Sequence, residues 1–316
     1  MMVLEDRWLR ETYVDLLIEY AAKNKDIVIL EADLMKAGGT FRFAEKYPER
    51  TFDVGIQEAN MIGTAAGMSE MGKIPFTHTF TAFATRRVCD QVTLSVAYAG
   101  LNVKMMGSDP GVTAEYNGGT HMSMEDVSIM RNIPGMIVYE PVDSAQLKAI
   151  FPQIVDHYGP VYIRLLRRNA VKVFEDGETF ELGKGKLMRE GSDVSIFATG
   201  IMVADAVEAV EELEKEGIHA ELINIHTVKP LDEEMVLASV AKTGCAVTAE
   251  NHSVIGGLGS AVAELLVEKD PVPVKKVGVM DHFGEVGLTP YLKEKYGLTA
   301  KDIIAAAKVA IAMKKR

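Results

Sequence analysis

Glu58 is the residue whose type and surroundings point most directly to chemistry. It follows a predicted strand and lies in the first turn of a predicted helix, within the stretch 52–61. The helix macrodipole favours a carboxylate at that place, whereas the small and apolar residues that follow imply partial burial, which favours the neutral acid. A carboxyl group whose charged form is favoured by the helix and disfavoured by burial is a candidate for proton transfer. Taken alone, the stretch favours a simpler interpretation, a glutamate that only stabilises a helix N-terminus.

The elements that must position Glu58 alternate between strand and helix. In the first half, strands are predicted over 27–30, 102–106, 136–139 and 161–165, and helices over 57–71, 85–98, 123–131 and 143–157. A second series has strands over 194–198, 220–225, 245–249 and 274–279, with helices over 203–216 and 298–313. This alternation predicts α/β domains, each with a largely parallel sheet covered by helices.

A polar, glycine-bearing stretch separates the two series. We therefore predict a first domain over 1–175, a linker over 176–191 and a second domain over 192–316. A length of 316 residues agrees with two domains of roughly 150 residues each.

Composition excludes several classes of function. The formal net charge of −11 argues against a surface that coats nucleic acid, and no apolar run is long enough for a membrane helix. The only cysteines, Cys89 and Cys245, are far apart and show no metal-ligand spacing. The absence of a signal-peptide pattern and the low cysteine content predict a reducing, cytoplasmic setting.

Polar residues follow several predicted strands at the point where each strand ends. Asp33 follows the strand at 27–30, Asp109 follows the strand at 102–106, and Arg167 follows the strand at 161–165. Because ligands of open α/β sheets bind at the carboxyl ends of the strands, we expect these side chains and Glu58 to converge on one edge.

The order and spacing of short motifs resemble the transketolase family over essentially the whole chain. The motifs are 52–61, 79–83, Arg87 with Asp90-Gln91, 115–121, 125–126, 131–134, 198–200, 228–232, 250–252 and 256–260. The resemblance implies two three-layer α/β/α domains. The first would have the thiamine-diphosphate-binding (pyrimidine) fold, and the second the transketolase C-terminal fold.

The resemblance implies thiamine diphosphate as cofactor and gives roles to four residues. Glu58 matches the glutamate that hydrogen-bonds N1′ of the aminopyrimidine and so promotes deprotonation of the thiazolium carbon. Phe80 and Phe83 match the aromatic residues that pack on that ring, and Asp33 matches an acidic residue beside the cofactor, where two subunits meet. Two simpler interpretations remain open: ordinary core aromatics for the phenylalanines, and a loop aspartate that caps the next turn for Asp33.

Five further residues match positions that contact the sugar phosphate substrate. His121 corresponds to a histidine near the donor carbonyl, where an imidazole can donate to a developing alkoxide or shuttle a proton. Arg167, and more weakly Arg7, correspond to arginines that bind the substrate phosphate. Asn117 and Asp109 replace an aspartate and a histidine of the family, so we expect a related branched or unusual sugar phosphate in place of xylulose 5-phosphate and ribose 5-phosphate.

Other charged or glycine-rich positions have simpler interpretations. Arg168 and Lys172 are interpreted as plain surface charge. The stretch 256–260 lacks both the glycine spacing of a dinucleotide fingerprint and the lysine of a phosphate loop, so it predicts a tight turn into the following helix.

The sequence lacks the family's Gly-Asp-Gly and distant Asn, which hold Mg²⁺ and the diphosphate. The resemblance is therefore to the C-terminal subunit of a split transketolase. It implies that a separate N-terminal subunit supplies the metal site and that the chain also forms homodimer contacts in an α2β2 assembly.

Three alternatives stay open at this point. A 1-deoxyxylulose-5-phosphate synthase-like subunit and the β subunit of a 2-oxoacid dehydrogenase use the same cofactor, and incubation with pyruvate would separate them from a transketolase. The third alternative is a non-catalytic scaffold subunit of the same fold.

Overall fold

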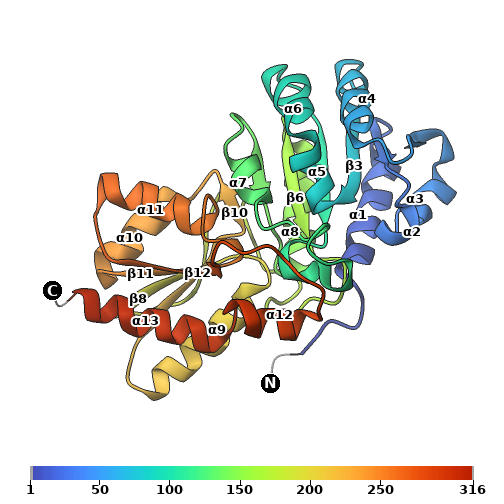
Figure 1. Ribbon diagram of the computed structural model, residues 1–316. Coiled ribbons are helices and arrows are strands. Elements are labelled where there is room, and N and C mark those ends of the chain that lie inside the picture. The colour runs from blue at the N-terminus through green and yellow to red at the C-terminus, as the bar shows by residue number, and fades with distance from the viewer. Residues whose placement is uncertain (1–2, 315–316) are drawn as a thin grey trace.

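The computed structural model describes residues 3–314, which form two sheets side by side, each covered by helices (Figure 1). The strands are β1 (Ile27–Glu31), β2 (Thr51–Asp53), β3 (Ile74–Phe80), β4 (Lys104–Ser108), β5 (Ile137–Tyr139), β6 (Val161–Leu165), β7 (Lys186–Arg189), β8 (Val194–Ala198), β9 (Ala220–Asn224), β10 (Thr227–Lys229), β11 (Ala246–Ser253) and β12 (Val274–Val279).

The α-helices are α1 (Leu9–Lys23), α2 (Met35–Gly38), α3 (Phe41–Lys46), α4 (Glu58–Glu70), α5 (Thr81–Ala84), α6 (Cys89–Gln91), α7 (Asp126–Arg131), α8 (Ser144–Asp156), α9 (Met202–Lys215), α10 (Glu233–Thr243), α11 (Leu258–Lys269), α12 (Thr289–Tyr296) and α13 (Ala300–Lys314). Four helical segments of 3₁₀ or π type are η1 (Pro48–Arg50), η2 (Arg86–Val88), η3 (Val92–Tyr98) and η4 (Gly111–Asn117). Of the described residues, none lie in a helix long and apolar enough to cross a membrane.

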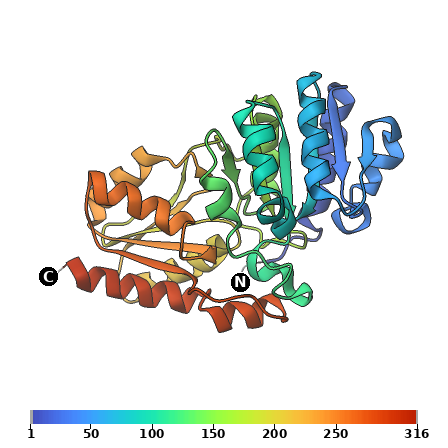
Figure 2. The same ribbon diagram turned by 45° about the horizontal axis from the view of Figure 1, so that its top comes forward.

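The first sheet has the strand order β10-β5-β6-β4-β3-β1-β2 and is parallel except for β10. Its central strands β1, β3, β4 and β6 are buried along almost their whole length, because helices cover both faces of the sheet. Helices α1 and α8 pack together on one face, and α4 with η3 packs on the other. Figure 2 shows these layers from above.

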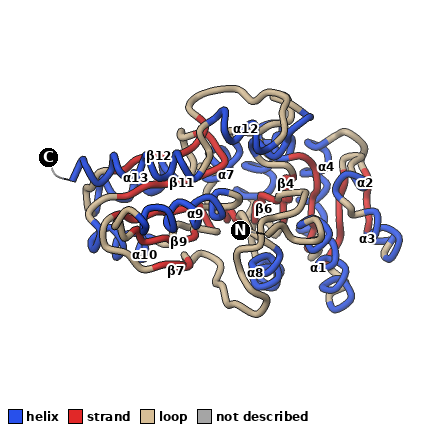
Figure 3. The backbone as a smooth tube through the Cα atoms, turned by 90° about the horizontal axis from the view of Figure 1, so that it is seen from below, coloured by secondary structure: helices blue, strands red, loops and turns tan. Residues whose placement is uncertain are grey.

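The second sheet has the order β12-β11-β8-β9-β7 and is parallel except for β7. Helices α9 and α13 pack on one face, the one seen in Figure 3, while α10 and α11 lie together on the other (Figure 1). The expected pair of three-layer α/β/α domains is therefore confirmed.

The chain crosses between the two sheets in ways that the sequence pattern did not indicate. The segment 176–191, predicted as linker, contains β7, which pairs antiparallel with β9 at the edge of the second sheet. Strand β10 lies between helices of the second domain in sequence, yet it pairs antiparallel with β5 of the first sheet. Both strands are short edge strands, which give a weak sequence signal.

Two further elements differ from expectation. Strand β3 was not predicted because Pro75 interrupts its apolar pattern and because Thr77, His78 and Thr79 are polar, although all three are buried. The single helix expected over 85–98 is instead η2, α6 and a π-helical η3 in succession. This irregular segment faces α4, and π-helical turns are frequent at functional sites.

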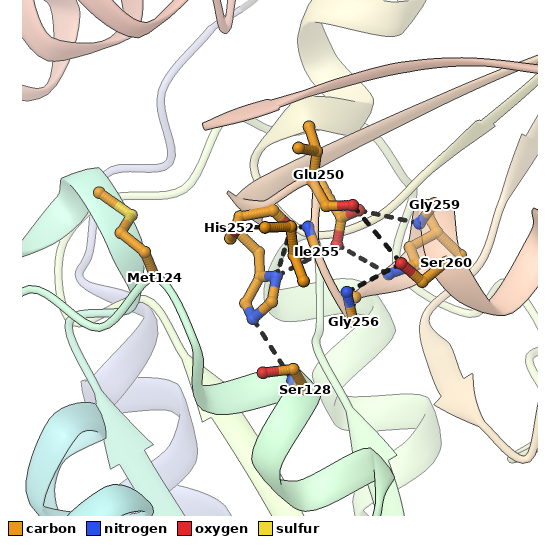
Figure 4. A network of polar contacts seen from close by, with 12 residues as sticks. Met124, Ser128, Glu250, His252, Ile255, Gly256, Gly259 and Ser260 are labelled. Carbon is orange, nitrogen blue, oxygen red and sulfur yellow. Dashed lines mark hydrogen bonds and ion pairs between the residues drawn. The ribbon is translucent and has the colours of Figure 1, made fainter. Parts of the chain in front are cut away.

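The contact between the domains is polar as well as apolar. In Figure 4, His252 on β11 faces Ser128 on α7, and its Nε2 accepts a hydrogen bond from the Ser128 backbone N–H at 3.4 Å.

Within the second domain, the Glu250 carboxylate accepts hydrogen bonds from the backbone N–H groups of Leu258 and Gly259 at 2.7 and 2.8 Å. Glu250 thus caps α11, which confirms that 256–260 is a turn into a helix.

Candidate active site

The sheet order brings the predicted site residues to one edge. Strands β6, β4, β3 and β1 are neighbours, and all four are parallel, so their carboxyl ends lie together. Asp33 follows β1, Phe80 ends β3, Asp109 follows β4, and Arg167 follows β6. The convergence expected from the sequence is therefore present in the fold.

Glu58 is the first residue of α4, and only 3% of it is exposed. Its Oε1 accepts a hydrogen bond from Arg87 Nη1 at 2.7 Å. The guanidinium carbon of Arg87 lies 3.7 Å from the ring centroid of Phe83, so one arginine joins the carboxylate to an aromatic face. Arg87 belongs to a motif that gave it no individual role, and the structure pairs it with Glu58.

Phe80, Phe83 and His121 form a cluster of rings. The centroid of His121 lies 5.4 Å from that of Phe80 and 5.1 Å from that of Phe83, and the two phenylalanines are 6.2 Å apart. All three side chains are partly exposed, and neither phenylalanine belongs to an apolar core of the described chain. Flat, accessible rings beside a buried carboxylate suit a flat heteroaromatic ligand better than they suit core packing.

His121 is held in place by its neighbours on the loop after η4. Its Nδ1 lies 2.9 Å from Thr120 Oγ1, and Arg86 donates to the Thr120 carbonyl oxygen at 2.8 Å. Burial, with the charges of Arg87 and Arg86, lowers the pKa of His121. The imidazole is therefore neutral near pH 7 and can donate or accept a proton. The consecutive residues Arg86 and Arg87 thus connect the loop of His121 with Glu58.

Asp109, which is buried, and Arg167, which is partly exposed, form an ion pair beside the ring cluster. Arg167 Nε lies 3.1 Å from Asp109 Oδ1, and the Arg167 guanidinium carbon lies 5.8 Å from the Phe80 ring centroid. Asp109 is 1% exposed and has a left-handed φ of 58°. Burial raises the pKa of Asp109 to about 6, although the Arg167 charge opposes this rise. At pH 7 the carboxylate is mostly ionised and offsets part of the positive charge of Arg167.

The structure does not bring Arg7 to this cluster. Arg7 is exposed before α1 and pairs with Asp15 at 2.6 Å. Arg10, in the first turn of α1, is close enough to Arg167 and Asp109 for their charges to act on it. Burial and the charge of Arg167 lower the pKa of Arg10, while the charges of Glu11 and Asp109 oppose this change.

Asp33 and Asn117 are exposed at the edge of the site. Asp33 has a left-handed φ of 59°, and its N–H donates to Asp53 Oδ1 at 3.0 Å. The N-cap residue of α2 is Leu34, and none of the side-chain hydrogen bonds of residues 3–314 joins the Asp33 carboxylate to that helix. Asn117 ends η4, four residues before His121.

The two positions interpreted as surface charge differ. Lys172 pairs with the exposed Glu175 at 2.6 Å, as expected of a surface residue. Arg168 pairs at 2.9 Å with the mostly buried Glu115. Arg168 and Glu115 both line a cavity of about 550 Å³ between the two domains.

Comparison with known proteins agrees with this geometry. The family model "Transketolase, pyrimidine binding domain" matches residues 7–172, and "Transketolase, C-terminal domain" matches residues 183–303. The chain belongs to the transketolase family. Its two domains and their order are those that the sequence motifs implied.

Individual transketolase relatives align over almost the whole chain. The chain is 71% identical over 304 residues to the 6-deoxy-6-sulfo-D-fructose transketolase subunit SqwH of Clostridium sp. (strain MSTE9), covering 96% of this chain and 94% of that protein. It is 34% identical to one subunit of the apulose-4-phosphate transketolase of Phocaeicola vulgatus, covering 94% and 96%. A solved structure described as a split gene transketolase, inactive β4 tetramer, is 47% identical, with a TM-score of 0.91 and coverage of 97% and 99%.

The side chains of this transketolase chain suit one part of the cofactor. Within residues 3–314, no three His, Cys, Asp or Glu side chains come together in a way that could hold a metal ion. The residues present fit the ring of the cofactor, since they offer a buried carboxylate and exposed aromatic faces.

A second buried network lies beneath the site, at the ends of β1 and β3. Glu31 accepts a hydrogen bond from Thr40 Oγ1 at 2.5 Å and lies 3.3 Å from His78 Nδ1, and the other nitrogen of His78 bonds Tyr13 Oη at 2.9 Å. Burial raises the pKa of Glu31 to about 8 and lowers the pKa of His78 to about 3. Both groups are therefore neutral at pH 7, and their contact is not an ion pair.

Replacing Glu31 by Gln should remove a pH dependence of stability. The pKa of Glu31 is raised on folding, so its contribution to stability is complete below pH 4.5 and declines as the pH rises towards 8. This decline approaches about 1.4 kcal/mol per pH unit. Glu31→Gln stays neutral and keeps an acceptor for Thr40. Thermal midpoints at pH 6, 7 and 8 should fall less in the variant than in the wild type, and parallel curves would contradict the assignment.

Proposed function

We propose that this chain is the C-terminal (β) subunit of a thiamine-diphosphate-dependent transketolase that moves a two-carbon ketol unit from a sulfonated ketose to an aldose acceptor. The observation that carries the proposal is the single cluster in which Glu58, Phe80, Phe83 and His121 lie beside the Asp109–Arg167 pair. The 71% identity to a 6-deoxy-6-sulfo-D-fructose transketolase subunit supports the choice of donor.

The cofactor, when bound, would supply an electron sink for cleavage of the carbon–carbon bond next to the donor carbonyl. In this chain, the Glu58 carboxyl group would share a hydrogen bond with the aminopyrimidine ring, since it is buried and held by Arg87. Phe80 and Phe83 would cover the ring and exclude water. His121, with its neutral imidazole, would donate to or accept from the donor hydroxyl groups.

A partner subunit completes the site in this proposal. Phe80, Phe83 and His121 are partly exposed, and the described chain offers no metal-binding cluster for the diphosphate. We therefore propose an N-terminal subunit that holds Mg²⁺ and the diphosphate, in an α2β2 assembly with homodimer contacts between copies of this chain. A cytoplasmic setting stays a prediction.

The anionic end of the donor would bind near Arg167 and Arg10. A phosphate monoester carries nearly two negative charges at pH 7, whereas a sulfonate carries one. Asp109 removes part of the positive charge of the pair of arginines, which suits the weaker anion. We therefore propose a sulfonate in place of the sugar phosphate expected from the sequence.

The test is ketol transfer by this chain alone and with its co-expressed N-terminal partner, with thiamine diphosphate and Mg²⁺ present. Activity with 6-deoxy-6-sulfo-D-fructose only in the mixture would support both the reaction and the partner. Decarboxylation of pyruvate by the mixture would instead favour a synthase or a 2-oxoacid dehydrogenase. No reaction in a correctly assembled complex would favour the scaffold interpretation.

Replacing Asp109 by Asn should weaken discrimination between the two anions. Asn fills a similar volume but leaves the charge of Arg167 uncompensated. The kcat/KM of a donor that ends in phosphate should therefore rise more than that of a donor that ends in sulfonate. We expect the ratio of kcat/KM for sulfonate over phosphate to fall about tenfold, which corresponds to about 1.4 kcal/mol. An unchanged ratio would show that Asp109 does not select the anion.

A further inference from the structure

Asn251, on β11 of the second domain, is completely buried and contacts two segments of the first domain. Its side-chain Nδ2 donates to the Pro110 carbonyl oxygen at 2.9 Å, and its Oδ1 accepts from the Val112 backbone N–H at 3.0 Å. Its own carbonyl oxygen accepts from Arg164 Nη2 at 2.7 Å. One residue of the C-terminal domain therefore joins the segment after β4 to strand β6.

Both of these segments lie next in the chain to the Asp109–Arg167 ion pair. Asp109 is the residue immediately before Pro110, and Arg167 lies three residues after Arg164. The distance of 3.1 Å between Asp109 and Arg167 thus depends on how the two segments are held relative to each other. Asn251 holds one segment by its side chain and the other by its backbone.

The backbone around Asp109 needs such support. Asp109 has a φ of 58°, a left-handed conformation that is unfavourable for a residue with a side chain and persists only where the surroundings impose it. Gly111 has a φ of 53°, and a Cβ at this position would clash with the amide of Asn251. The close approach of Asn251 to Gly111 therefore fixes the path of the chain between Asp109 and Val112.

We propose that Asn251 is a positioning residue through which the C-terminal domain sets the Asp109–Arg167 pair for the anionic end of the sugar. The inference rests on the proposed function, since it names a determinant of recognition at the same site. It gives the second domain a part in donor recognition, although this domain supplies no group to the ring cluster.

The test compares two donors in the reconstituted complex. One donor is 6-deoxy-6-sulfo-D-fructose. The other is a short uncharged ketose, which has no anionic group to bind at the Asp109–Arg167 ion pair. For Asn251→Ala we expect KM for the sulfonated donor to rise about tenfold, which is the scale of one lost hydrogen-bonded contact. We expect kcat/KM for the uncharged ketose to stay within about twofold. An equal loss with both donors, or no loss with either, would overturn the proposal.

Two further variants keep this test independent of general damage to the fold. Gly111→Ala disturbs the same contact from the first domain and should give the same split between the donors. His252→Gln is the matched control, because His252 neighbours Asn251 but its side-chain hydrogen bonds go to Ser128 and Ser253 and not to the segment 109–112. It should lower thermal stability without separating the donors. If His252→Gln raised KM for the sulfonated donor as much as Asn251→Ala does and spared the uncharged ketose, the effect would belong to the contact between the domains as a whole, and the proposal would fail.

A binding measurement separates this inference from the proposed reaction. Methanesulfonate, as a minimal probe, should raise the thermal midpoint of the wild-type chain and of His252→Gln, but not that of Asn251→Ala. If the complex transferred no ketol unit and this pattern held, the reaction would be wrong and the role of Asn251 would stand. Equal stabilisation of all three proteins, or of none, would overturn the role of Asn251.

Discussion

Replacing Glu58 by Gln should lower ketol transfer by the reconstituted complex by a factor of about 10²–10⁴, the usual contribution of a positioned acid or base. Gln keeps the shape of the side chain and can still accept a hydrogen bond from Arg87. Gln lacks the negative charge with which a carboxylate can accept a hydrogen bond from, or exchange a proton with, a ring nitrogen of the cofactor. Because the substitution preserves volume in a position that is 3% exposed, we expect folding and assembly to be unchanged.

The matched control for this variant is Glu70→Gln at the other end of the same helix. Glu70 is exposed and lies at the last residue of α4. The same chemical change there should leave turnover within about twofold, since surface substitutions usually change little. Turnover should be measured with saturating cofactor, and assembly by size-exclusion chromatography. If Glu58→Gln were as active as Glu70→Gln, the scaffold interpretation would be favoured over catalysis.

Much of the fold could be predicted from local pattern. Strands β1 and β6 are buried on both faces and begin with apolar runs, over 27–30 and 161–163, and their sequence signal is strong for that reason. Strand β3 gave no such signal, because Thr77, His78 and Thr79 are polar although they are buried. His78, for example, bonds Tyr13, which lies 65 residues away in the sequence. Contacts of that kind exist only after folding.

The candidate site was predictable in part for the same reason. Glu58, Phe80, Phe83 and His121 follow from motifs whose order is visible in the sequence, and the structure brings them together. Arg7 lies before α1 and Arg10 lies in its first turn, and the start of a helix is fixed by sequence only to within one or two residues, so the sequence did not separate the two arginines. The partnership between Arg87 and Glu58 likewise depends on the irregular helical segment over 86–98, which replaces the regular helix we expected.

The largest loss of stability is expected on replacing Arg164 by Met. Arg164 is completely buried and donates to Asp126 at 2.6 Å, to Glu140 at 2.7 Å and to the Asn251 carbonyl oxygen at 2.7 Å. Burial opposes the charged form of Asp126, yet the Arg164 guanidinium holds the pKa of that carboxyl below its usual range. Removing the arginine would leave two buried carboxyl groups without a counter-charge, which typically costs about 3–5 kcal/mol.

A surface arginine provides the matched control for Arg164→Met. Arg189 on β7 pairs with Glu214 at 3.4 Å, and 38% of its side chain is exposed. Arg189→Met should therefore cost less than about 1 kcal/mol, because exposed ion pairs contribute little. Thermal midpoints of both variants, measured beside the wild type, would separate a buried counter-charge from a simple change of side chain.

The dependence of the Arg164→Met loss on pH identifies its cause. Without the guanidinium, burial raises the pKa of Asp126 and Glu140 in the folded state above their unfolded values, so the deficit should grow as the pH rises from 5 to 8 and shrink as it falls. Adding Asp126→Asn and Glu140→Gln to Arg164→Met should restore much of the stability and remove this dependence. A deficit that is equal at pH 5 and pH 8, and that the neutral pair does not relieve, would mean that lost packing outweighs charge. Arg164 would then stabilise the contact between the domains through packing and not through its charge. Its link through Asn251 to the Asp109–Arg167 ion pair would likewise be steric.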